Sequence, residues 1–285
     1  MPVSIELKDN VYGKSRVRLV KVERQGPRHG LKDLSIDIQL WGAFELAYTE
    51  GDNRMVLPTD TMKNTVYVLA RQEPLGEIEE FGTRLAEHFL FRNQHVSRAR
   101  IAITENLWER MPYDDAGHDH SFELSGPERR AAVIDRDRAN TSLQAGIIDL
   151  IVMKTTQSAF EGFLRDEYTT LKETSDRLFG TAVKAEWSYK SSAKFFGDVW
   201  RGVRSALLEV FASHDSRGVQ HTLYAMGEAV LERFDSIDEI HISMPNRHCL
   251  LVDLSPFQLD NPNEVFVPTD EPHGVIEATL RRSDS

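Results

Sequence analysis

The alternation of apolar and polar side chains in Val183–Lys190 limits the fold of this 285-residue chain more than any other feature. In an extended strand, Val183, Ala185, Trp187 and Tyr189 would fall on one face, and the polar residues between them on the other. A strand with one buried and one solvated face is typical of antiparallel sheets, whereas parallel strands are usually buried on both faces. The sequence therefore predicts antiparallel sheet.

Other segments extend this α+β pattern along the chain. Strand-like runs outnumber the long helices and occur at Arg16–Val22, Ser35–Leu40, Arg98–Thr104, Gly146–Met153, Ile240–Met244, Leu250–Leu254 and Val275–Leu280. Three stretches have helical apolar spacing: Ile78, Phe81, Leu85 and Phe89; Val199, Val203, Leu207 and Phe211; and Val219, Leu223, Met226 and Val230. Each set forms a single apolar stripe, so the helices are predicted to cover one face of a sheet.

The chain is long enough for two cores of about 140 residues each. Residues between Trp108 and Glu128 are polar and include Pro112, Gly117 and Gly126, which predicts loops leading to a domain boundary near residue 140. We therefore expect two tandem domains of similar length, spanning residues 1–140 and 141–285.

Composition excludes several classes of function. A formal net charge of −11 argues against a nucleic-acid partner, because phosphate binding requires a clustered basic face. The single cysteine, Cys249, excludes an intrachain disulfide and fits a reducing compartment. No apolar run reaches the roughly 18 residues of a membrane span, and neither a signal peptide nor a peroxisomal Ser-Lys-Leu ending is recognisable. We expect a cytoplasmic, bacterial-type protein with no membrane partner.

The junction at Leu57–Tyr67 is a candidate binding site. A strand-like run ends at Pro58, and Thr59 stands where the N-cap of a helix is expected. The unpaired N–H groups and the positive dipole end of such a helix attract a negatively charged ligand. The alternative reading is an ordinary strand-to-helix turn capped by Thr59.

Common catalytic signatures are missing from the sequence. It contains no dinucleotide-binding glycine motif, no Walker loop, no nucleophile elbow and no His-Glu-x-x-His zinc motif. His118 and His120 could ligate zinc, but no third ligand lies at a useful spacing, so no metal site is predicted and a solvated loop remains the alternative. In Met244–His248, an extended chain would direct Asn246 and His248 to the same side.

Several separated motifs together resemble one enzyme family. They are PTDTMKNTVYVLA from Pro58, GFLRDEYTTLKETSDR from Gly162, GVQHTLYAM from Gly218 and MPNRHCLLVDL from Met244. In this order and spacing they resemble urate oxidase, the cofactor-free uricase family. The Tyr12-Gly13-Lys14 motif and the segment from Asp260 to Phe266 extend the resemblance over nearly the whole chain.

The resemblance implies a tunnelling fold (T-fold), in which two tandem domains, each an antiparallel sheet with helices on one face, assemble into a barrel-like tunnel. It further implies a homotetramer with active sites between subunits. The implied reaction converts urate, dioxygen and water into 5-hydroxyisourate and hydrogen peroxide, without metal or flavin. Deprotonated urate is electron-rich and can transfer electrons to dioxygen itself, so the protein deprotonates and orients it and excludes bulk water.

The resemblance also implies roles for individual residues. Lys14 and Thr59 match the catalytic dyad, and His248 completes the proton relay. Burial lowers the pKa of a lysine and lets it accept a proton, which a threonine hydroxyl can pass on. Family members often carry alanine at the position of Pro58, so the backbone leading into Thr59 can be held differently here.

Further positions match the family's contacts to the substrate. Arg177 and Gln220 match the clamp on the edge of the planar purine, to which they offer a donor fork and an amide. Phe160 matches the stacking ring, and the backbone N–H groups of Asp60 and Val219 match further contacts. Asn246 matches the residue that holds dioxygen or water over the ring face.

Two other functions stay open on these residues. The first is a non-catalytic purine-binding protein on the same scaffold, which would bind a purine without consuming oxygen. The second is a metal-dependent hydrolase that uses His118 and His120, whose turnover chelation would abolish.

Overall fold

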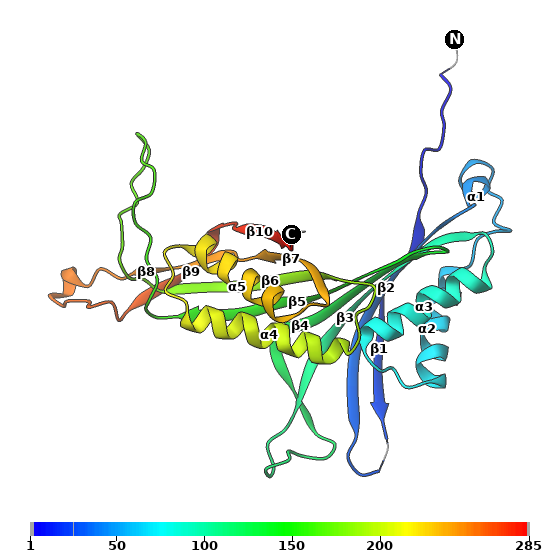
Figure 1. The fold of residues 1–285 in the computed structure, drawn as a ribbon, viewed down its shortest axis with the longest axis horizontal. Coiled ribbons are helices and arrows are strands. Elements are labelled where there is room, and N and C mark those ends of the chain that lie inside the picture. Colours follow the sequence, from blue (N-terminus) through cyan, green and yellow to red (C-terminus); the bar gives the residue numbers. More distant parts are fainter. Residues whose placement is uncertain (1–2, 25, 284–285) are drawn as a thin grey trace. The chain divides into compact units, whose positions relative to one another are not determined.

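The chain divides into two compact units in the computed structural model, which describes residues 3–24 and 26–283. One unit runs to Ala145 and includes Ser188–Phe196, and the other contains Gly146–Trp187 and the described chain from Gly197 onwards. Both units combine antiparallel strands with helices, as the alternation and the helical stripes predict (Figure 1).

The first unit is a sheet in the order β1-β2-β3-β4, and each adjacent pair is antiparallel. Its elements are β1 (Tyr12–Glu23), β2 (Gly30–Gly42), α1 (Glu45–Thr49), α2 (Thr59–Gln72), α3 (Ile78–Arg92), β3 (Val96–Arg110) and β4 (Phe122–Asp137). The next strand, β5 (Thr141–Lys154), begins in this unit and continues into the second.

The core of the first unit lies between this sheet and helices α2 and α3 (Figure 1). Alternate residues of β2 are buried, as expected for a strand with one covered face: Leu34, Ile36, Ile38 and Leu40. The predicted apolar stripe of α3 is also buried, and it consists of Ile78, Phe81, Leu85 and Phe89. Both phenylalanines of this stripe are fully enclosed. The predicted helix and its buried face are confirmed.

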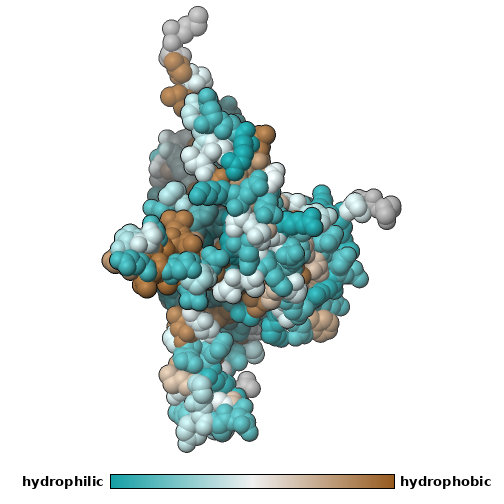
Figure 2. All heavy atoms as spheres, turned by 90° about the vertical axis from the view of Figure 1, so that its left-hand side faces the viewer, coloured by the Kyte–Doolittle hydropathy of each residue, from teal (hydrophilic) through white to brown (hydrophobic). Residues whose placement is uncertain are grey.

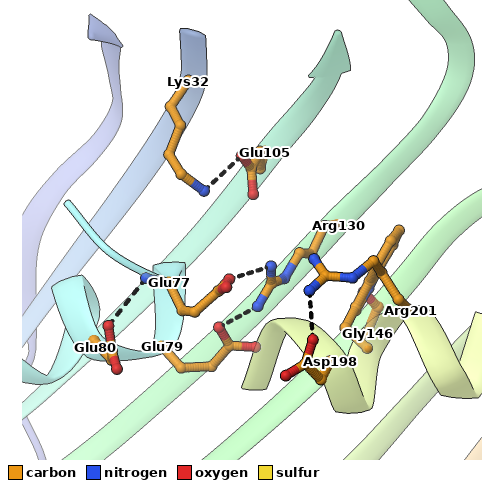
Figure 3. A network of polar contacts seen from close by, with 10 residues as sticks. Lys32, Glu77, Glu79, Glu80, Glu105, Arg130, Gly146, Asp198 and Arg201 are labelled. Atoms are coloured by element: carbon orange, nitrogen blue, oxygen red, sulfur yellow. Dashed lines mark hydrogen bonds and ion pairs between the residues drawn. The ribbon is translucent and has the colours of Figure 1, made fainter. Parts of the chain in front are cut away.

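A buried ion cluster joins the start of α3 to β4 (Figure 3). Arg130 donates from its two terminal nitrogens to Glu77 and Glu79, at 2.6 Å each. The Glu79 side chain is fully buried, and its burial raises the pKa of this carboxyl despite the attraction of Arg130. The neighbouring Lys32–Glu105 pair, at 3.1 Å, joins β2 to β3.

The second unit contains the strand order β5-β6-β7-β10, and β8 pairs with both β6 and β9. Its elements after β5 are β6 (Phe179–Tyr189), α4 (Phe196–Ser213), α5 (Val219–Arg233), β7 (Ile237–Ser243), β8 (Asn246–Leu251), the 3₁₀ helix η1 (Ser255–Phe257), β9 (Phe266–Gly274) and β10 (Glu277–Arg281). Among the described strands, the order is open at β1 and at β10.

The alternation that predicted antiparallel sheet is confirmed in β6. Val183, Ala185 and Trp187 are at most 1 % exposed, whereas Lys184 is exposed and pairs with Glu186 at 2.7 Å. The α5 stripe is also buried, and so are Val203, Leu207 and Phe211 of α4, whose Val199 is only partly covered. Phe211 and Met226 are core residues, as predicted.

The loops predicted between Trp108 and Glu128 occupy less of this range than expected, because strands extend into both of its ends. β3 continues to Arg110 and β4 begins at Phe122, and these two residues are paired across the strands. Gly126 has a φ of 110° and lies with Pro127 where the register shifts. A bulge tolerates both residue types within a strand, so the polar, glycine-containing sequence conceals strand structure there.

Two strands, β4 and β9, were not predicted from the sequence. β4 is hidden by the polar start just described, and β9 contains Pro268 and Pro272. Proline cannot donate to a strand ladder and lowers the strand signal of a segment. Within the described residues, no helix combines the length and the apolar composition needed to cross a membrane.

Candidate functional site

The first unit places Lys14 at an irregular point of β1. Lys14 lies opposite Ile38, and the register of β1 against β2 shifts directly after it. Arg16, inside this bulge, has a φ of 56° and donates its backbone N–H to Asp37 at 2.7 Å. Gly13 approaches β2 so closely that a Cβ atom would lie 1.8 Å from the Ile38 carbonyl oxygen. Position 13 therefore requires glycine. The half-buried Lys14 stands directly before the bulge.

The predicted threonine stands at the start of α2, but not as its cap. Thr59 is the first helical residue, and Pro58 occupies the N-cap position without a side-chain cap bond. The Pro58 carbonyl accepts the first helical hydrogen bond from Met62 N at 3.2 Å, and its φ of −56° suits proline. The prediction of Thr59 as N-cap is wrong, and its hydroxyl is not used for capping.

The start of α2 already carries an acidic side chain. Asp60 forms an ion pair with Lys63 and accepts a hydrogen bond from Asn64 Nδ2 at 3.0 Å. The hydrogen bond from Lys63 is the main reason that the pKa of Asp60 is lowered, and the charge of Lys14 contributes to the lowering. Lys14 and the α2 N-terminus therefore share one electrostatic environment, in which the helix end also favours an anion.

The second unit brings Phe160 and Arg177 together. Phe160 forms an isolated antiparallel bridge with Thr174, with N···O distances of 2.8 and 3.2 Å. The guanidinium carbon of Arg177 lies 5.3 Å from the centroid of the Phe160 ring. Arg177 Nε is buried without a hydrogen-bond partner, and burial lowers the pKa of this guanidinium, which nevertheless stays charged at neutral pH. A buried donor without a partner suits an acceptor that comes from outside the chain.

Asp176, which the sequence reading passed over, ties these segments together. Its carboxylate accepts from Thr156 Oγ1 at 2.8 Å and from Ser158 N at 3.3 Å. The hydrogen bond from Thr156 is the main cause of the lowered pKa of Asp176. Asp176, the residue before Arg177, thereby holds the segment that precedes Phe160. Its position next to Arg177 in the motif is the only sequence signal for this role.

The predicted amide lies at the start of α5. Gly218 is the N-cap, and Val219 and Gln220 are the first two helical residues. A Cβ on Gly218 would lie 3.6 Å from both Gln220 Oε1 and the Phe160 ring, so the amide and the ring flank the same glycine. Ser216 supports this turn by donating from Oγ to the Gly218 carbonyl at 3.0 Å. Phe160, Arg177, Val219 and Gln220 thus form one group.

Asn246 and His248 belong to the same unit and lie on β8. Asn246 is paired with Thr181 of β6, four residues beyond Arg177, whereas His248 is paired with Thr269 of β9. Both side chains are half-buried. The pairing with β6 places β8 beside the strand that follows Arg177. That the side chains of Asn246 and His248 point in the same direction stays a prediction.

The histidine alternative does not produce a ligand set. The His118 and His120 rings are 4.5 Å apart and nearly perpendicular, and the His29 ring lies 5.9 Å from that of His120. In the described part of the chain, no group of three His, Cys, Asp or Glu side chains could hold a metal ion. The hypothesis of a metal-dependent hydrolase therefore lacks a third metal ligand beside His118 and His120 among the described residues.

The candidate site therefore consists of two groups of residues, one in each unit. The first group contains Lys14, Thr59 and Asp60, and the second contains Phe160, Arg177, Val219, Gln220, Asn246 and His248. The first offers a cation, a hydroxyl and a helix N-terminus, and the second offers a guanidinium, an amide, an aromatic face and an imidazole. This chemistry suits a planar, anionic, nitrogen-rich ring.

Antiparallel sheets with helices on one face, repeated in two tandem units, define a T-fold protein. The sequence model of the family described as Uricase matches residues 10–135 and 143–277. The chain belongs to the uricase family.

Individual relatives agree with this assignment. The uricase of Arthrobacter globiformis is 46% identical over 281 residues, which cover 99% of this chain and 91% of the relative. The uricase of Dictyostelium discoideum is 39% identical, with 97% of this chain and 98% of that protein covered. The crystal structure of the Arthrobacter globiformis uricase superposes with a TM-score of 0.95 over 99% of this chain and 97% of that one.

Proposed function

We propose that this protein is a urate oxidase, which converts urate, dioxygen and water into 5-hydroxyisourate and hydrogen peroxide. Urate loses two electrons, dioxygen gains them, and the hydroxyl of the product comes from water. The observation that carries the proposal is the buried, unpartnered Nε of Arg177, which lies beside the Phe160 ring in a member of the uricase family. A planar anion stacked on Phe160 supplies the acceptor that Arg177 lacks.

Each predicted residue then has a role in the reaction. Arg177 and Gln220 hold one edge of the purine, and the N–H groups of Asp60 and Val219 contact it at two helix N-termini. Thr59 passes a proton between the substrate or water and Lys14, and His248 completes the relay. Asn246 holds dioxygen first and water afterwards, over the face of the ring.

No cofactor is required by this proposal. The urate anion is the reductant, and the site orients it and keeps bulk water away. We also propose a cytoplasmic location, which the single free cysteine, Cys249, supports.

We further propose that the two groups meet across subunits of a homotetramer. The division of the site residues between two units supports this arrangement. Exposed apolar side chains support it as well, since β8 and β9 alone expose Leu250, Leu251 and Val267 by about half. Apolar side chains also gather in patches on the face drawn in Figure 2. Exposed apolar patches are typical of surfaces that bind another protein.

Oxygen consumption tests the proposed function. In buffer with a metal chelator, we expect urate to be consumed with an equal amount of dioxygen, together with release of hydrogen peroxide. Tight binding of urate without oxygen uptake would favour the non-catalytic purine-binding protein. Turnover that chelation abolishes would favour a metal enzyme.

A further inference from the structure

The Tyr12 hydroxyl bridges both backbone groups of one distant residue. Leu57 donates its N–H to Tyr12 Oη at 2.9 Å, and Tyr12 Oη donates to the Leu57 carbonyl at 3.2 Å. A phenol can donate one hydrogen bond and accept another, so this side chain takes the place of a strand partner for Leu57. The residue it holds is the last one before Pro58 and Thr59.

The backbone around both partners leaves little freedom. After Leu57, Pro58 has a fixed φ, and its carbonyl accepts the first bond of α2. After Tyr12, Gly13 is pressed against β2, and Lys14 precedes the bulge. One residue, Gly13, therefore separates the bridging phenol from Lys14, and one residue, Pro58, separates its partner from Thr59. A shift of this bridge moves both groups relative to each other.

The surroundings of Tyr12 keep the bridge in place. Its ring packs edge-on against Phe44, with centroids 4.7 Å apart, and Phe44 is only 1 % exposed. Burial is also the main reason that the pKa of the Tyr12 phenol is raised. The hydroxyl therefore stays protonated at neutral pH and can donate to the Leu57 carbonyl.

We infer that Tyr12 is a positioning residue for proton transfer, which holds the Thr59 hydroxyl in register with the Lys14 amine through its bridge to Leu57. The inference rests on the proposed function, in which Lys14 and Thr59 move the proton. Tyr12 acts through these two residues, so its loss affects the chemical step and not the purine clamp of the other unit.

Tyr12→Phe tests the inference because it removes only the hydroxyl. We expect kcat for urate to fall between about ten- and a hundredfold, since small misplacements of reacting groups have effects of this size. Binding of xanthine, a purine that serves as a non-reacting probe, should stay within twofold of wild type. The solvent deuterium isotope effect on kcat should rise, because proton transfer becomes slower than the other steps.

Tyr48→Phe is the matched control. Tyr48 also donates its hydroxyl to a backbone carbonyl, that of Val11 at 3.2 Å, but it is 51 % exposed and its hydrogen bond holds Val11 and not Leu57. This variant should retain kcat and the isotope effect of wild type.

A second variant covers the case in which Tyr12→Phe does not fold. Replacing the Leu57 N–H by an ester oxygen deletes one bond of the bridge and leaves the Tyr12 ring and its packing on Phe44 intact. The same selective loss of kcat is expected.

Three results would overturn the inference. They are full activity of Tyr12→Phe, full activity of the ester variant, or a fall in xanthine binding that parallels the fall in kcat. The last result would assign Tyr12 a purely structural role. A wild-type protein that takes up no oxygen with urate would instead refute the proposed function, and the inference with it.

Discussion

The proposed function assigns proton transfer and substrate binding to different side chains. Thr59 is the first residue of α2 and not its N-cap, and the proposed function assigns its hydroxyl to proton transfer. Arg177 lies in the other unit beside the Phe160 ring, and the proposed function assigns it to substrate binding. Substitutions at these two positions should therefore have different kinetic effects.

Thr59→Ala should lower kcat and leave binding of xanthine nearly intact. Loss of a group that transfers a proton in the transition state typically lowers the rate by about 10² to 10⁴. Steady-state oxygen uptake and equilibrium titration with xanthine measure the two quantities. Weakened xanthine binding at an unchanged kcat would contradict the assigned role.

Arg177→Ala should chiefly weaken binding. A hydrogen bond to a charged group contributes about 1.5–3 kcal/mol, so xanthine affinity should fall by roughly 10- to 150-fold. Arg165→Ala is the control, because Arg165 also lies over a phenylalanine, Phe163, at 5.1 Å, but it is exposed. Equal losses in both variants would mean that the effect comes from net charge and not from the clamp.

At the scale of elements, α3 is attached to β4 by charge as well as by apolar packing. Arg130 contacts Glu77 and Glu79 at the first turn of the helix, and Glu79 is fully buried (Figure 3). Removing one partner of a buried pair leaves the other charge without compensation. The start of α3 should therefore be sensitive to this arginine.

Arg130→Ala should lower the free energy of unfolding by about 3–5 kcal/mol at neutral pH. Arg201→Ala, which breaks the exposed pair with Asp198 at 2.7 Å on α4, should lower it by less than about 1 kcal/mol. Urea titration monitored by circular dichroism measures both. Similar losses in the two variants would show that burial does not determine the contribution of these pairs.

The effect of Arg130→Ala should also depend on pH. The pKa of buried Glu79 is already raised with Arg130 present, and loss of the arginine raises it further. A carboxyl with a raised pKa in the folded state favours folding below its unfolded value of about 4.3 and penalises folding as the pH rises above it. The destabilisation should therefore be larger at pH 7 than at pH 4.5, and an equal loss at both values would rule out this explanation.

At the scale of the whole molecule, the proposed arrangement between subunits predicts complementation. Thr59→Ala and Arg177→Ala chains each retain one intact half of the site. When both chains share a tetramer at random, about a quarter of intersubunit sites combine two intact halves. Co-expression should restore about that fraction of wild-type turnover, whereas mixing already assembled tetramers should not. Absence of restored activity would place both halves of each site in one chain.

Local patterns predicted much of this architecture. Alternation in β6 and the stripes of α3 and α5 identified buried faces correctly, because a face is set by the spacing of consecutive residues. Local patterns did not predict β4 and β9, because β4 contains a glycine and both strands contain proline. These residues are tolerated there because each strand has a pairing partner and β4 has a bulge against β3. Strand pairing is not encoded in any one segment, so composition misled there.

Separated motifs were enough to identify the uricase family, because each of them is a run of adjacent residues that can be read without a fold. They could not reveal which residues meet. Tyr12 and Leu57 are 45 positions apart, and Arg130 and Glu79 are 51 apart. Folding alone also decided that Pro58 caps α2 and that Thr59 does not, because a cap is set by backbone angles and by the carbonyl that accepts the first helical bond.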